Sequence, residues 1–461
     1  MIAIPIVAST VKEALKDIRK SNADLVELRL DFIKDINTSR LEKLLRTNRK
    51  AIVTDRKKRH ELIKKAIELK AGFIDLDISL GEKSIKNIIK EKQNTRIIVS
   101  FHNFKKTDRK EINARYSQIK KLNPDIIKIV TYANSIEDNL IILGLIKKAK
   151  KQKIKIIALC MGEKGQISRI LSVPFGAFLT FGSLEKGKES APGQIQAKAL
   201  KEIYHVNELK NPKIFGLLGN PVSHSKGYIF HNRKFKKSEK IYVNFLVNDI
   251  SSFIRKFKPI ISGLSITIPF KRKVIRLLDK VGPLAKKIGA VNTVIKKKNK
   301  LIGYNTDITG AIKAISSKTR IKGKNVLLLG AGGVARAIAY GIVNEGGNLI
   351  IINRTEKKAK NLSKELNCSS AALKELPKLS CIDIIINATS IGMEPNIENT
   401  PIKKKILRKI SKKNALVFDS VYTPKTTKLL KQAEKLGFIT VSGYDMFINQ
   451  AEEQARLFLE V

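Results

Sequence analysis

The length, composition and charge of this chain exclude several classes of protein. Its 461 residues exceed one ordinary domain, and 43% hydrophobic with 28% charged residues is enough apolar material for packed cores, which excludes wholesale disorder. No apolar stretch of the sequence is long enough to span a membrane. We therefore predict two folded halves of about 200 to 250 residues each.

The net charge of +49, from 90 Lys and Arg against 41 Asp and Glu, raises the question of a polyanionic partner. The cations are spread along the whole chain, and lysine greatly outnumbers arginine, whereas phosphate-reading sites favour arginine. Ile and Asn are also abundant, which is typical of an AT-rich genome. We attribute the charge to composition bias, predict no nucleic-acid partner, and expect attraction of small anionic substrates.

Cysteine usage and the N-terminal segment bear on the compartment. Cys160, Cys368 and Cys381 are odd in number and lack metal-ligand spacing, so we predict no bound metal and no disulfide framework. The first apolar run is too short for a signal peptide, and no basic segment precedes it. We expect a soluble, cytoplasmic protein without a membrane partner; its oligomeric state stays open.

Eight short β-rich runs alternate with amphipathic, lysine-rich helical stretches between residue 2 and about residue 200. The runs are IPIVAS (2–9 region), DLVELRL (24–30), AIVTD (51–55), FIDLDI (73–78), RIIVSFH (96–102), DIIKIVTY (125–132), KIIALCM (155–161) and AFLTFG (177–182). Alternation of strand and helix indicates parallel βαβ units, and eight repeats close a (β/α)8 barrel. We predict an α/β fold with such a barrel over residues 1–207.

Active sites of these barrels lie at the C-terminal ends of the strands. The polar residues expected there are Glu27, Arg29, Arg56, Asp77, His102, Lys128 and Arg169, with the loop from Ser190 to Gln194. Three arginines, a lysine and a histidine at one mouth are typical of a site for a carboxylated, hydroxylated anion.

Taken singly, these residues also have ordinary structural explanations, as three of them show. Lys128 can be a solvated lysine in a lysine-rich chain, His102 a structural histidine, and Arg29 the partner of Glu27 in an ion pair. Lys128, however, lies in the apolar run IIKIV, where an unpaired ammonium is costly. This position favours a nucleophilic amine that attacks a ketone.

The segments VELRLD, SFHNFKKT, DIIKIV, GQISR and SAPGQ together resemble the type I 3-dehydroquinate dehydratases, over roughly residues 1–205. The resemblance implies that Lys128 forms a Schiff base with the substrate ketone and that His102 is the general acid and base. It implies substrate contacts at Glu27, Arg29, Arg56, Arg169, Ser190 and Gln194. The implied reaction converts 3-dehydroquinate to 3-dehydroshikimate.

One position departs from that family, which often has an acidic residue four places after the arginine that follows the third strand. His60 stands there, with Glu61 beside it. Three explanations are open: Glu61 substitutes for the acid, the loop is shifted, or the orientation of His102 is weakened.

A polar connector without a Gly/Ser tract, HVNELKNPK at 205–213, leads into the second half of the chain. There the segment NVLLLGAGGVARAIAYG places an apolar strand before a glycine turn and a helix after it. This order is typical of a dinucleotide-binding turn, in which glycines let a pyrophosphate approach the helix N-terminus. The predicted cofactor contacts of the turn are Gly330, Ala331, Gly332 and Gly333.

The next strand, LIIINRT, ends without the acidic residue that binds the ribose 2′-hydroxyl of NAD. Instead it ends in Asn353, Arg354 and Thr355, with Lys358 one turn later. Basic side chains here suit the 2′-phosphate of NADP, although a lysine-rich chain also produces basic turns by chance. We predict NADP as the cofactor.

Seven motifs around that turn, GNPVSHSKG, GLSITIPFK, GAVNT, GYNTD, NATSIGM, VYTP and GYDMFINQAEEQ, resemble shikimate dehydrogenase over 213–461. The resemblance implies a substrate domain at 213–310, completed by a C-terminal helix at 445–461, and a Rossmann NADP domain at 311–444. It implies a catalytic pair, Lys271 and Asp307. It implies further substrate contacts at Ser225, Thr267, Asn292, Tyr422 and Gln450, and cofactor contacts at Thr389, Ser390 and Met446.

This second resemblance also has a departure. The family usually reads SxSP, with two serines that hold the substrate carboxylate, whereas this chain reads Ser225-Lys226-Gly227-Tyr228. One hydrogen bond fewer to a charged group costs about 1.5–3 kcal/mol of binding. The space beside Gly227 could instead admit the extra hydroxyl of quinate.

We therefore predict a bifunctional enzyme that dehydrates 3-dehydroquinate and then reduces 3-dehydroshikimate to shikimate with NADPH. Two alternatives stay open. The second half could be a quinate dehydrogenase, or the chain could be a basic nucleic-acid-binding protein built on decayed enzyme folds.

Overall fold

The computed structural model describes residues 1–48, 50–223 and 225–461. The chain divides into two compact units. The first comprises Met1–Ile214, Phe235–Val247 and Arg255–Phe257, and the second comprises Phe215–Lys234, Asn248–Ile254 and Lys258–Val461. Within the described residues, no helix combines the length and apolar character that a membrane span requires.

The first unit contains an eight-stranded parallel sheet in the order β7-β6-β5-β4-β3-β2-β1-β8. Its strands are β1 (Ile2–Ile6), β2 (Leu25–Arg29), β3 (Ile52–Thr54), β4 (Phe73–Asp77), β5 (Arg96–His102), β6 (Ile126–Tyr132), β7 (Ile156–Met161) and β8 (Thr180–Phe181). β1 pairs with both β2 and β8. Next to β8, the Phe178 N–H donates to the Ile156 carbonyl of β7 at 2.7 Å, which nearly closes the ring. All eight predicted strands and the predicted barrel are confirmed.

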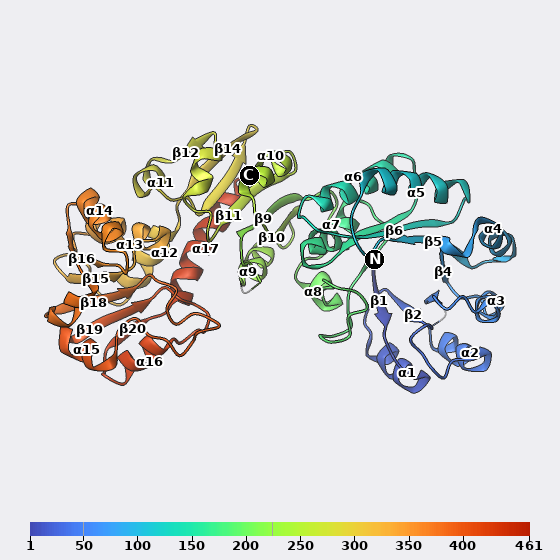
Figure 1. Ribbon diagram of the computed structural model, residues 1–461, viewed down its shortest axis with the longest axis horizontal. Coiled ribbons are helices and arrows are strands. Elements are labelled where there is room, and N and C mark those ends of the chain that lie inside the picture. The colour runs from blue at the N-terminus through green and yellow to red at the C-terminus, as the bar shows by residue number, and fades with distance from the viewer. Residues whose placement is uncertain (49, 224) are drawn as a thin grey trace. The chain divides into compact units, whose positions relative to one another are not determined.

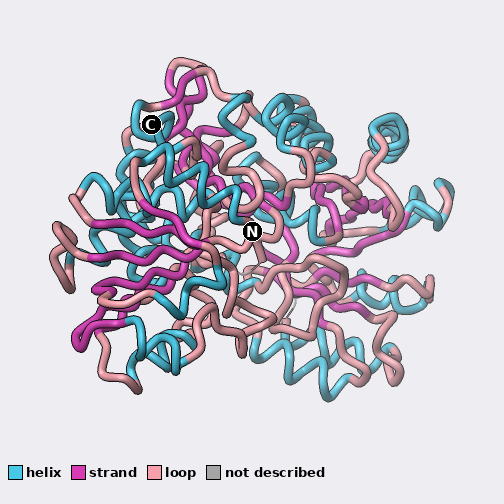
Figure 2. The backbone as a smooth tube through the Cα atoms, turned by 60° about the vertical axis from the view of Figure 1, so that its left-hand side comes forward, coloured by secondary structure: helices cyan, strands magenta, loops and turns pink. Residues whose placement is uncertain are grey.

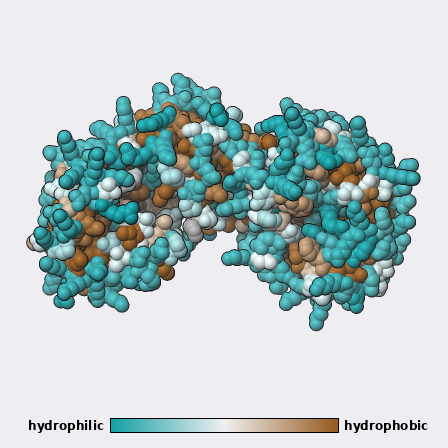
Figure 3. Space-filling view, viewed as in Figure 1, coloured by the Kyte–Doolittle hydropathy of each residue, from teal (hydrophilic) through white to brown (hydrophobic). Residues whose placement is uncertain are grey.

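Helices cover the outside of this sheet (Figure 1). They are α1 (Val11–Lys20), α2 (Thr38–Thr47), α3 (His60–Glu68), α4 (Glu82–Glu91), α5 (Arg109–Lys121), α6 (Asp138–Lys151), α7 (Gln166–Phe175) and α8 (Ala197–Glu202), with the 3-10 turns η1 (Ile78–Leu80) and η2 (Glu163–Gly165). Their buried residues recur at helical spacing, as Leu41, Leu44 and Leu45 do in α2. The lysines lie on the opposite faces, and hydrophilic residues cover most of the face shown in Figure 3.

A second, six-stranded sheet has the order β10-β9-β11-β13-β14-β12. Its strands are β9 (Lys213–Gly219), β10 (Lys240–Leu246), β11 (Ile261–Ile266), β12 (Lys280–Val281), β13 (Thr293–Lys297) and β14 (Lys300–Tyr304), accompanied by α9 (Gly227–Lys234), α10 (Ile250–Phe257), η3 (Lys273–Leu277) and α11 (Pro283–Ile288). β13 lies antiparallel between β11 and β14.

A third sheet has the order β17-β16-β15-β18-β19-β20, and all of its pairs are parallel. Its strands are β15 (Asn325–Leu329), β16 (Asn348–Ile352), β17 (Ser369–Ala371), β18 (Ile382–Asn387), β19 (Ser411–Asp419) and β20 (Ile439–Val441). This is the strand order of a Rossmann dinucleotide-binding fold, in which the ligand lies where the order reverses. The predicted Rossmann fold is confirmed.

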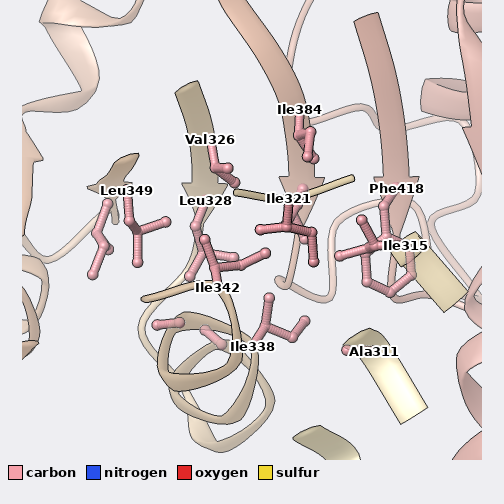
Figure 4. Close-up of a cluster of buried hydrophobic side chains, with 14 of the residues drawn as sticks. Ala311, Ile315, Ile321, Val326, Leu328, Ile338, Ile342, Leu349, Ile384 and Phe418 are labelled. Carbon is pink, nitrogen blue, oxygen red and sulfur yellow. The ribbon is translucent and has the colours of Figure 1, made fainter. Parts of the chain in front are cut away.

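Helices cover both faces of the third sheet (Figure 2). They are α12 (Asp307–Ser316), α13 (Gly333–Asn344), α14 (Glu356–Leu366), η4 (Leu373–Lys378), α15 (Lys404–Ile410), α16 (Lys428–Glu434) and α17 (Gly443–Leu459). Val326 and Leu328 of β15 pack toward α13, as Figure 4 shows, whereas Leu327 and Leu329 belong to the core on the α15–α16 side. A strand buried on both faces reads as a continuous apolar run, which explains the sequence NVLLL.

Two candidate active sites

Side-chain alternation along the barrel strands builds the first site. Leu25, Ile52, Phe73, Ile98 and Ile126, from β2 to β6, belong to one buried apolar cluster. Two residues further along each strand, and therefore on the same face, stand Glu27, Thr54, Asp75, Ser100 and Lys128. An apolar floor thus carries a buried polar layer toward the C-terminal end of the barrel.

Lys128 is 5% exposed and is paired with two buried carboxylates. Its Nζ lies 2.6 Å from Asp75 Oδ2 and 3.4 Å from Glu27 Oε1. The ring of Phe181 lies beneath the same ammonium, with its centroid 4.5 Å away. Carboxylates from β4 and β2 therefore compensate the charge of this buried ammonium.

Asp75, which the sequence analysis did not single out, is the centre of this layer. Its Oδ1 accepts hydrogen bonds from the Ser100 hydroxyl at 2.5 Å and from Arg56 at 3.2 Å. Burial by itself raises the pKa of a carboxyl group, but the charges of Arg56 and Lys128 hold the pKa of Asp75 well below its usual range. Asp75 is therefore an anion that lies beside the lysine throughout the physiological pH range.

His102 lies at the end of β5, with its Nδ1 3.2 Å from Asp77 Oδ2. Burial lowers the pKa of His102, Arg56 and Lys128 add to that effect, and Asp77 opposes it. The ring is therefore neutral near pH 7 and can accept a proton. The exposed ring of Phe104 stacks on it, with centroids 5.9 Å apart and planes 13° from parallel.

The carboxylate beside His102 comes from β4 and not from the loop after β3. His60 begins α3, and both His60 and Glu61 are exposed. Glu61 therefore does not substitute for the missing acid, because Asp77 already occupies the position next to the histidine. The alternation FIDLDI was the signal for this arrangement, since it directs Asp75 and Asp77 to one face.

The arginines of the first site differ in their partners. Arg29 forms a two-pronged pair with Asp31, at 3.0 and 2.7 Å, so the alternative that Glu27 is its partner is wrong. Arg56 reaches Asp75 and Asp77. Both guanidinium groups lie on the rim above the buried layer, where a bound anion can reach them.

Arg169 is 1% exposed on α7 and touches the predicted substrate loop. Its guanidinium donates to the Pro192 carbonyl at 3.4 Å, while its Nε has no hydrogen-bond partner among the described residues. Within the loop, the Ser190 N–H donates to Gln194 Oε1 at 2.7 Å. Burial lowers the pKa of Arg169 to about 10. A buried cation with an unused donor fits a carboxylate that would complete it.

The second site is built around an ion pair between Lys271 and Asp307. The Lys271 Nζ lies 2.6 Å from Asp307 Oδ2, and the Asn292 amide donates to Asp307 Oδ1 at 2.9 Å. Asp307 begins α12, where the helix dipole favours an anion. The predicted pair and the predicted asparagine are therefore brought together.

Gln450 joins this group from α17, the final helix. Its Oε1 accepts from Thr306 at 3.3 Å and from Asn292 at 3.4 Å. The approach depends on Gly310 of α12, where a Cβ atom would lie 2.7 Å from the Cβ of Gln450. Met446, one turn earlier, is buried in the core of the third sheet, so it supports the cofactor domain from within.

Three more predicted substrate residues lie in the same unit. The Tyr422 hydroxyl and Ser225 share a hydrogen bond, and burial raises the pKa of that tyrosine. Ser225 Oγ also accepts the N–H of Gly227 at 3.3 Å. The methyl group of Thr267 packs against Gly219 in a contact that leaves no room for a side chain there.

The glycine turn after β15 has the space that a dinucleotide requires. Gly330 has φ +118°, and a Cβ there would lie 2.8 Å from the Ala388 carbonyl. Among the residues that the structure describes, none would lie within 4 Å of a Cβ at Gly332, and none caps α13 there with its side chain. At Gly333 a Cβ would lie 3.5 Å from the Lys271 side chain, so the turn adjoins the second site. These residues fit a pyrophosphate at the helix N-terminus.

The remaining cofactor residues flank that turn. Ala331 is half-buried against the core of the third sheet, and Asn353 donates to the Thr355 carbonyl at 3.0 Å. The Thr389 hydroxyl donates to Asn387 at 2.7 Å, which anchors its loop. Four of the predicted residues are exposed and free to meet a ligand from solvent: Arg354, Thr355, Lys358 and Ser390.

Family models match both halves of the chain. Residues 2–211 match the family described as type I 3-dehydroquinase, residues 217–294 the shikimate dehydrogenase substrate binding domain, and residues 311–425 shikimate/quinate 5-dehydrogenase. The predicted resemblance to both families is confirmed.

Individual relatives have names that agree with these family matches. A chloroplastic bifunctional 3-dehydroquinate dehydratase/shikimate dehydrogenase of Arabidopsis thaliana is 38% identical over 99% of this chain and 82% of its own. A shikimate dehydrogenase (NADP(+)) of Pyrococcus abyssi is 40% identical over 53% of this chain and 92% of its own. A solved shikimate dehydrogenase in complex with NADP+ is 37% identical, covers 54% of this chain and 91% of its own, and has a TM-score of 0.50.

The predicted NADP cofactor agrees with these names, and the predicted pairing of a lyase with an oxidoreductase is confirmed. Because the similarity to the Arabidopsis protein covers 99% of this chain and 82% of that protein, this chain belongs to the family of bifunctional 3-dehydroquinate dehydratase/shikimate dehydrogenases.

Proposed function

We propose that the barrel dehydrates 3-dehydroquinate through a Schiff base on Lys128. The observation that carries this proposal is one lysine, buried among carboxylates at the barrel mouth, with a neutral histidine on the neighbouring strand. Glu27, Arg29, Arg56 and Arg169 supply acceptors and cations for the hydroxyl and carboxylate groups of the substrate. Ser190 and Gln194 belong to the loop beside Arg169 and complete the binding site.

The chemistry begins with loss of a proton from Lys128 to solvent, while Asp75, 2.6 Å away, remains the anion that stabilises the cationic forms of the lysine. The free amine adds to the ketone carbon, and loss of water leaves an iminium that acidifies the adjacent C–H bond. His102 removes that proton, the electron pair forms the C=C bond, and the leaving hydroxyl takes the proton from His102 and departs as water. Hydrolysis of the imine restores Lys128 and releases 3-dehydroshikimate.

We propose that the second site reduces 3-dehydroshikimate to shikimate. NADPH, when bound at the glycine turn, supplies the hydride. Lys271 donates a proton to the developing alkoxide, and Asp307 holds that lysine. Asn292 and Gln450 position the ring hydroxyls, whereas Ser225, Thr267 and Tyr422 belong to the carboxylate end of the substrate. Arg354 and Lys358, with Asn353 and Thr355, are proposed to bind the 2′-phosphate.

We propose the domain boundaries 1–207 for the dehydratase, 213–310 with 445–461 for the substrate domain, and 311–444 for the NADP domain. The three family matches, at 2–211, 217–294 and 311–425, support this division. The product of the first reaction is the substrate of the second, which gives the fusion a metabolic reason.

The preference for shikimate over quinate is also a proposal. Gly227 has no hydroxyl to bind the substrate carboxylate, but Ser225 and Tyr422 are linked, and Thr267 lies in the same segment as Lys271. The third family match covers both substrates in its name. We propose shikimate, because Thr267 and the rest of the pocket motif are those of a shikimate site.

We further propose a cytoplasmic protein without a nucleic-acid partner. Cys160, Cys368 and Cys381 are free thiols, which suits a reducing compartment. Two assembled ion-pair sites argue against decayed enzyme folds. A salt titration with duplex DNA and RNA would test the nucleic-acid alternative, which predicts tight and salt-sensitive binding.

One mixture tests both activities. Purified protein is given 3-dehydroquinate and NADPH, and the absorbances of the enone and of NADPH are followed together. We expect NADPH loss with the wild type, enone accumulation without NADPH loss with Lys271→Ala, and neither signal with Lys128→Ala. Lys128→Ala supplied directly with 3-dehydroshikimate should still oxidise NADPH. Loss of both activities from either single change in a folded protein would refute the two-site proposal.

A further inference from the structure

Gln454 is a buried amide on α17, one turn after Gln450. Figure 1 shows this long red helix running from the third sheet to the strands of the second. The Gln454 side chain is 3% exposed and uses both of its ends. Its Oε1 accepts the Ser265 hydroxyl of β11 at 2.8 Å, and its Nε2 donates to the Asn292 carbonyl at 3.2 Å and to Thr293 Oγ at 3.0 Å.

The orientation of this amide is determined by its neighbours. The Asn292 carbonyl can only accept a hydrogen bond, so the atom that faces it must be the NH2 group of Gln454. The same NH2 group then donates to Thr293, whose hydroxyl oxygen becomes an acceptor. The hydrogen of that hydroxyl is left for another partner.

Thr293 links the orientation of the Gln454 amide to that of the Asn292 amide. Its hydroxyl donates to Asn292 Oδ1 at 2.8 Å, and this oxygen also accepts the Thr306 N–H at 2.8 Å. With its oxygen held by two donors, Asn292 turns its NH2 group to Asp307 Oδ1, 2.9 Å away. Asp307 in turn holds Lys271 at 2.6 Å. A continuous series of hydrogen bonds therefore runs from Gln454 through Thr293, Asn292 and Asp307 to Lys271.

We infer that Gln454 and Thr293 are positioning residues of the dehydrogenase, which set the orientation of the Asn292 amide and through it the carboxylate of Asp307. Thr293 is fully buried, so it acts through Asn292 and not by touching the substrate. The inference rests on the proposed roles of Lys271, Asp307 and Asn292. It also assigns a task to α17 beyond its contribution of Gln450.

The test is a pair of matched variants at Thr293. Thr293→Val keeps the shape and removes the hydroxyl, whereas Thr293→Ser keeps the hydroxyl and removes the methyl group. One neutral hydrogen bond corresponds to a change of about threefold to tenfold. We expect Thr293→Val to raise the KM for 3-dehydroshikimate by about that factor with an unchanged KM for NADPH, and Thr293→Ser to match the wild type.

Gln454→Leu removes the first residue of the series and should raise the same KM by about tenfold or more, because the hydrogen bonds to Ser265, Asn292 and Thr293 are lost together with the one to the buried His231. The KM for NADPH, whose proposed binding residues lie in the same unit, is the folding control in every case, and the dehydratase activity calibrates the amount of protein. A KM for 3-dehydroshikimate equal to the wild type in Thr293→Val overturns the inference. A Thr293→Ser variant as impaired as Thr293→Val also overturns it, because the loss would then be one of packing.

Failure of the inference is separable from failure of the proposed function. An active Lys271→Ala variant would contradict the dehydrogenase site itself. An inactive Lys271→Ala variant with a wild-type Thr293→Val variant would retain that site and reject only the positioning role. A lower kcat with unchanged KM values in Thr293→Val would indicate a smaller active fraction, and would also reject the positioning role.

Discussion

Lys128 and Asp75 form a buried ion pair inside the barrel, with Nζ 2.6 Å from Oδ2, although 53 positions separate them in the chain. The Asp75 side chain has no exposed surface, and Arg56 also pairs with it. The Asp75 anion therefore lies within hydrogen-bond distance of the lysine nitrogen, where it stabilises the ammonium and the iminium that the lysine forms with a ketone.

Replacement of Asp75 by Asn should damage both stability and dehydration. The change leaves Arg56 without its closest anion and Lys128 with Glu27 alone, and a broken buried pair costs about 3–5 kcal/mol. We expect a lower denaturation midpoint for the barrel, loss of most dehydratase activity and a normal dehydrogenase rate. Ser100→Ala is the matched control, because it removes only one hydrogen bond to Asp75 and should cost about 1 kcal/mol. Equal effects of the two variants would contradict the importance of the charge.

The pH dependence of dehydration should report on His102. Since burial lowers the pKa of this histidine, its neutral, proton-accepting form persists below the usual value of about 6.5. The acid limb of kcat/KM for 3-dehydroquinate should therefore lie below that pH. Asp77 opposes the lowering, so Asp77→Asn should move the limb to still lower pH and reduce the plateau rate. His102→Ala should lose about 100- to 10,000-fold. A limb that rises in Asp77→Asn would contradict the assignment.

Arg354→Asp should discriminate between the two nicotinamide cofactors. If Arg354 binds the 2′-phosphate, loss of a charged hydrogen bond of about 1.5–3 kcal/mol should raise the KM for NADPH about 10- to 100-fold. The KM for NADH, which has no phosphate there, should change little. Lys364→Asp is the control for net charge, because Lys364 lies in the last turn of α14, whereas Arg354 precedes that helix. Equal changes for NADPH and NADH would refute the phosphate contact.

Gly227→Ser should shift the substrate preference of the dehydrogenase. Gly227 lies two residues after Ser225 and donates its N–H to that serine. A second hydroxyl at this position can bind the substrate carboxylate and fills the space beside C1. We expect kcat/KM for shikimate to rise relative to quinate by about 10-fold or more, measured with both substrates and NADP+. An unchanged ratio would show that this position does not select between them.

Much of the architecture follows from local patterns in the sequence. Strand alternation with helices predicted eight barrel strands, and each of them is present. The apolar strand before the glycine turn predicted the cofactor fold, because only that order lets a ligand reach a helix N-terminus at Gly333. The positions of Glu27, His102 and Lys128 within or at the ends of their strands predicted that they lie toward one end of the barrel, since the strands are parallel and their C-terminal ends lie together.

The partners of those residues were decided by tertiary structure. Nothing local to Arg29 distinguishes Glu27 from Asp31 as its partner, and nothing near His102 in the chain names Asp77. Registers between parallel strands bring β4 beside β5, and the return of α17 brings Gln450 and Gln454 to Asn292. The sequence by itself determined which side chains face a common centre, because that depends on local periodicity. Only the tertiary structure decided which of them touch, because contacts between distant segments depend on the packing of whole strands and helices.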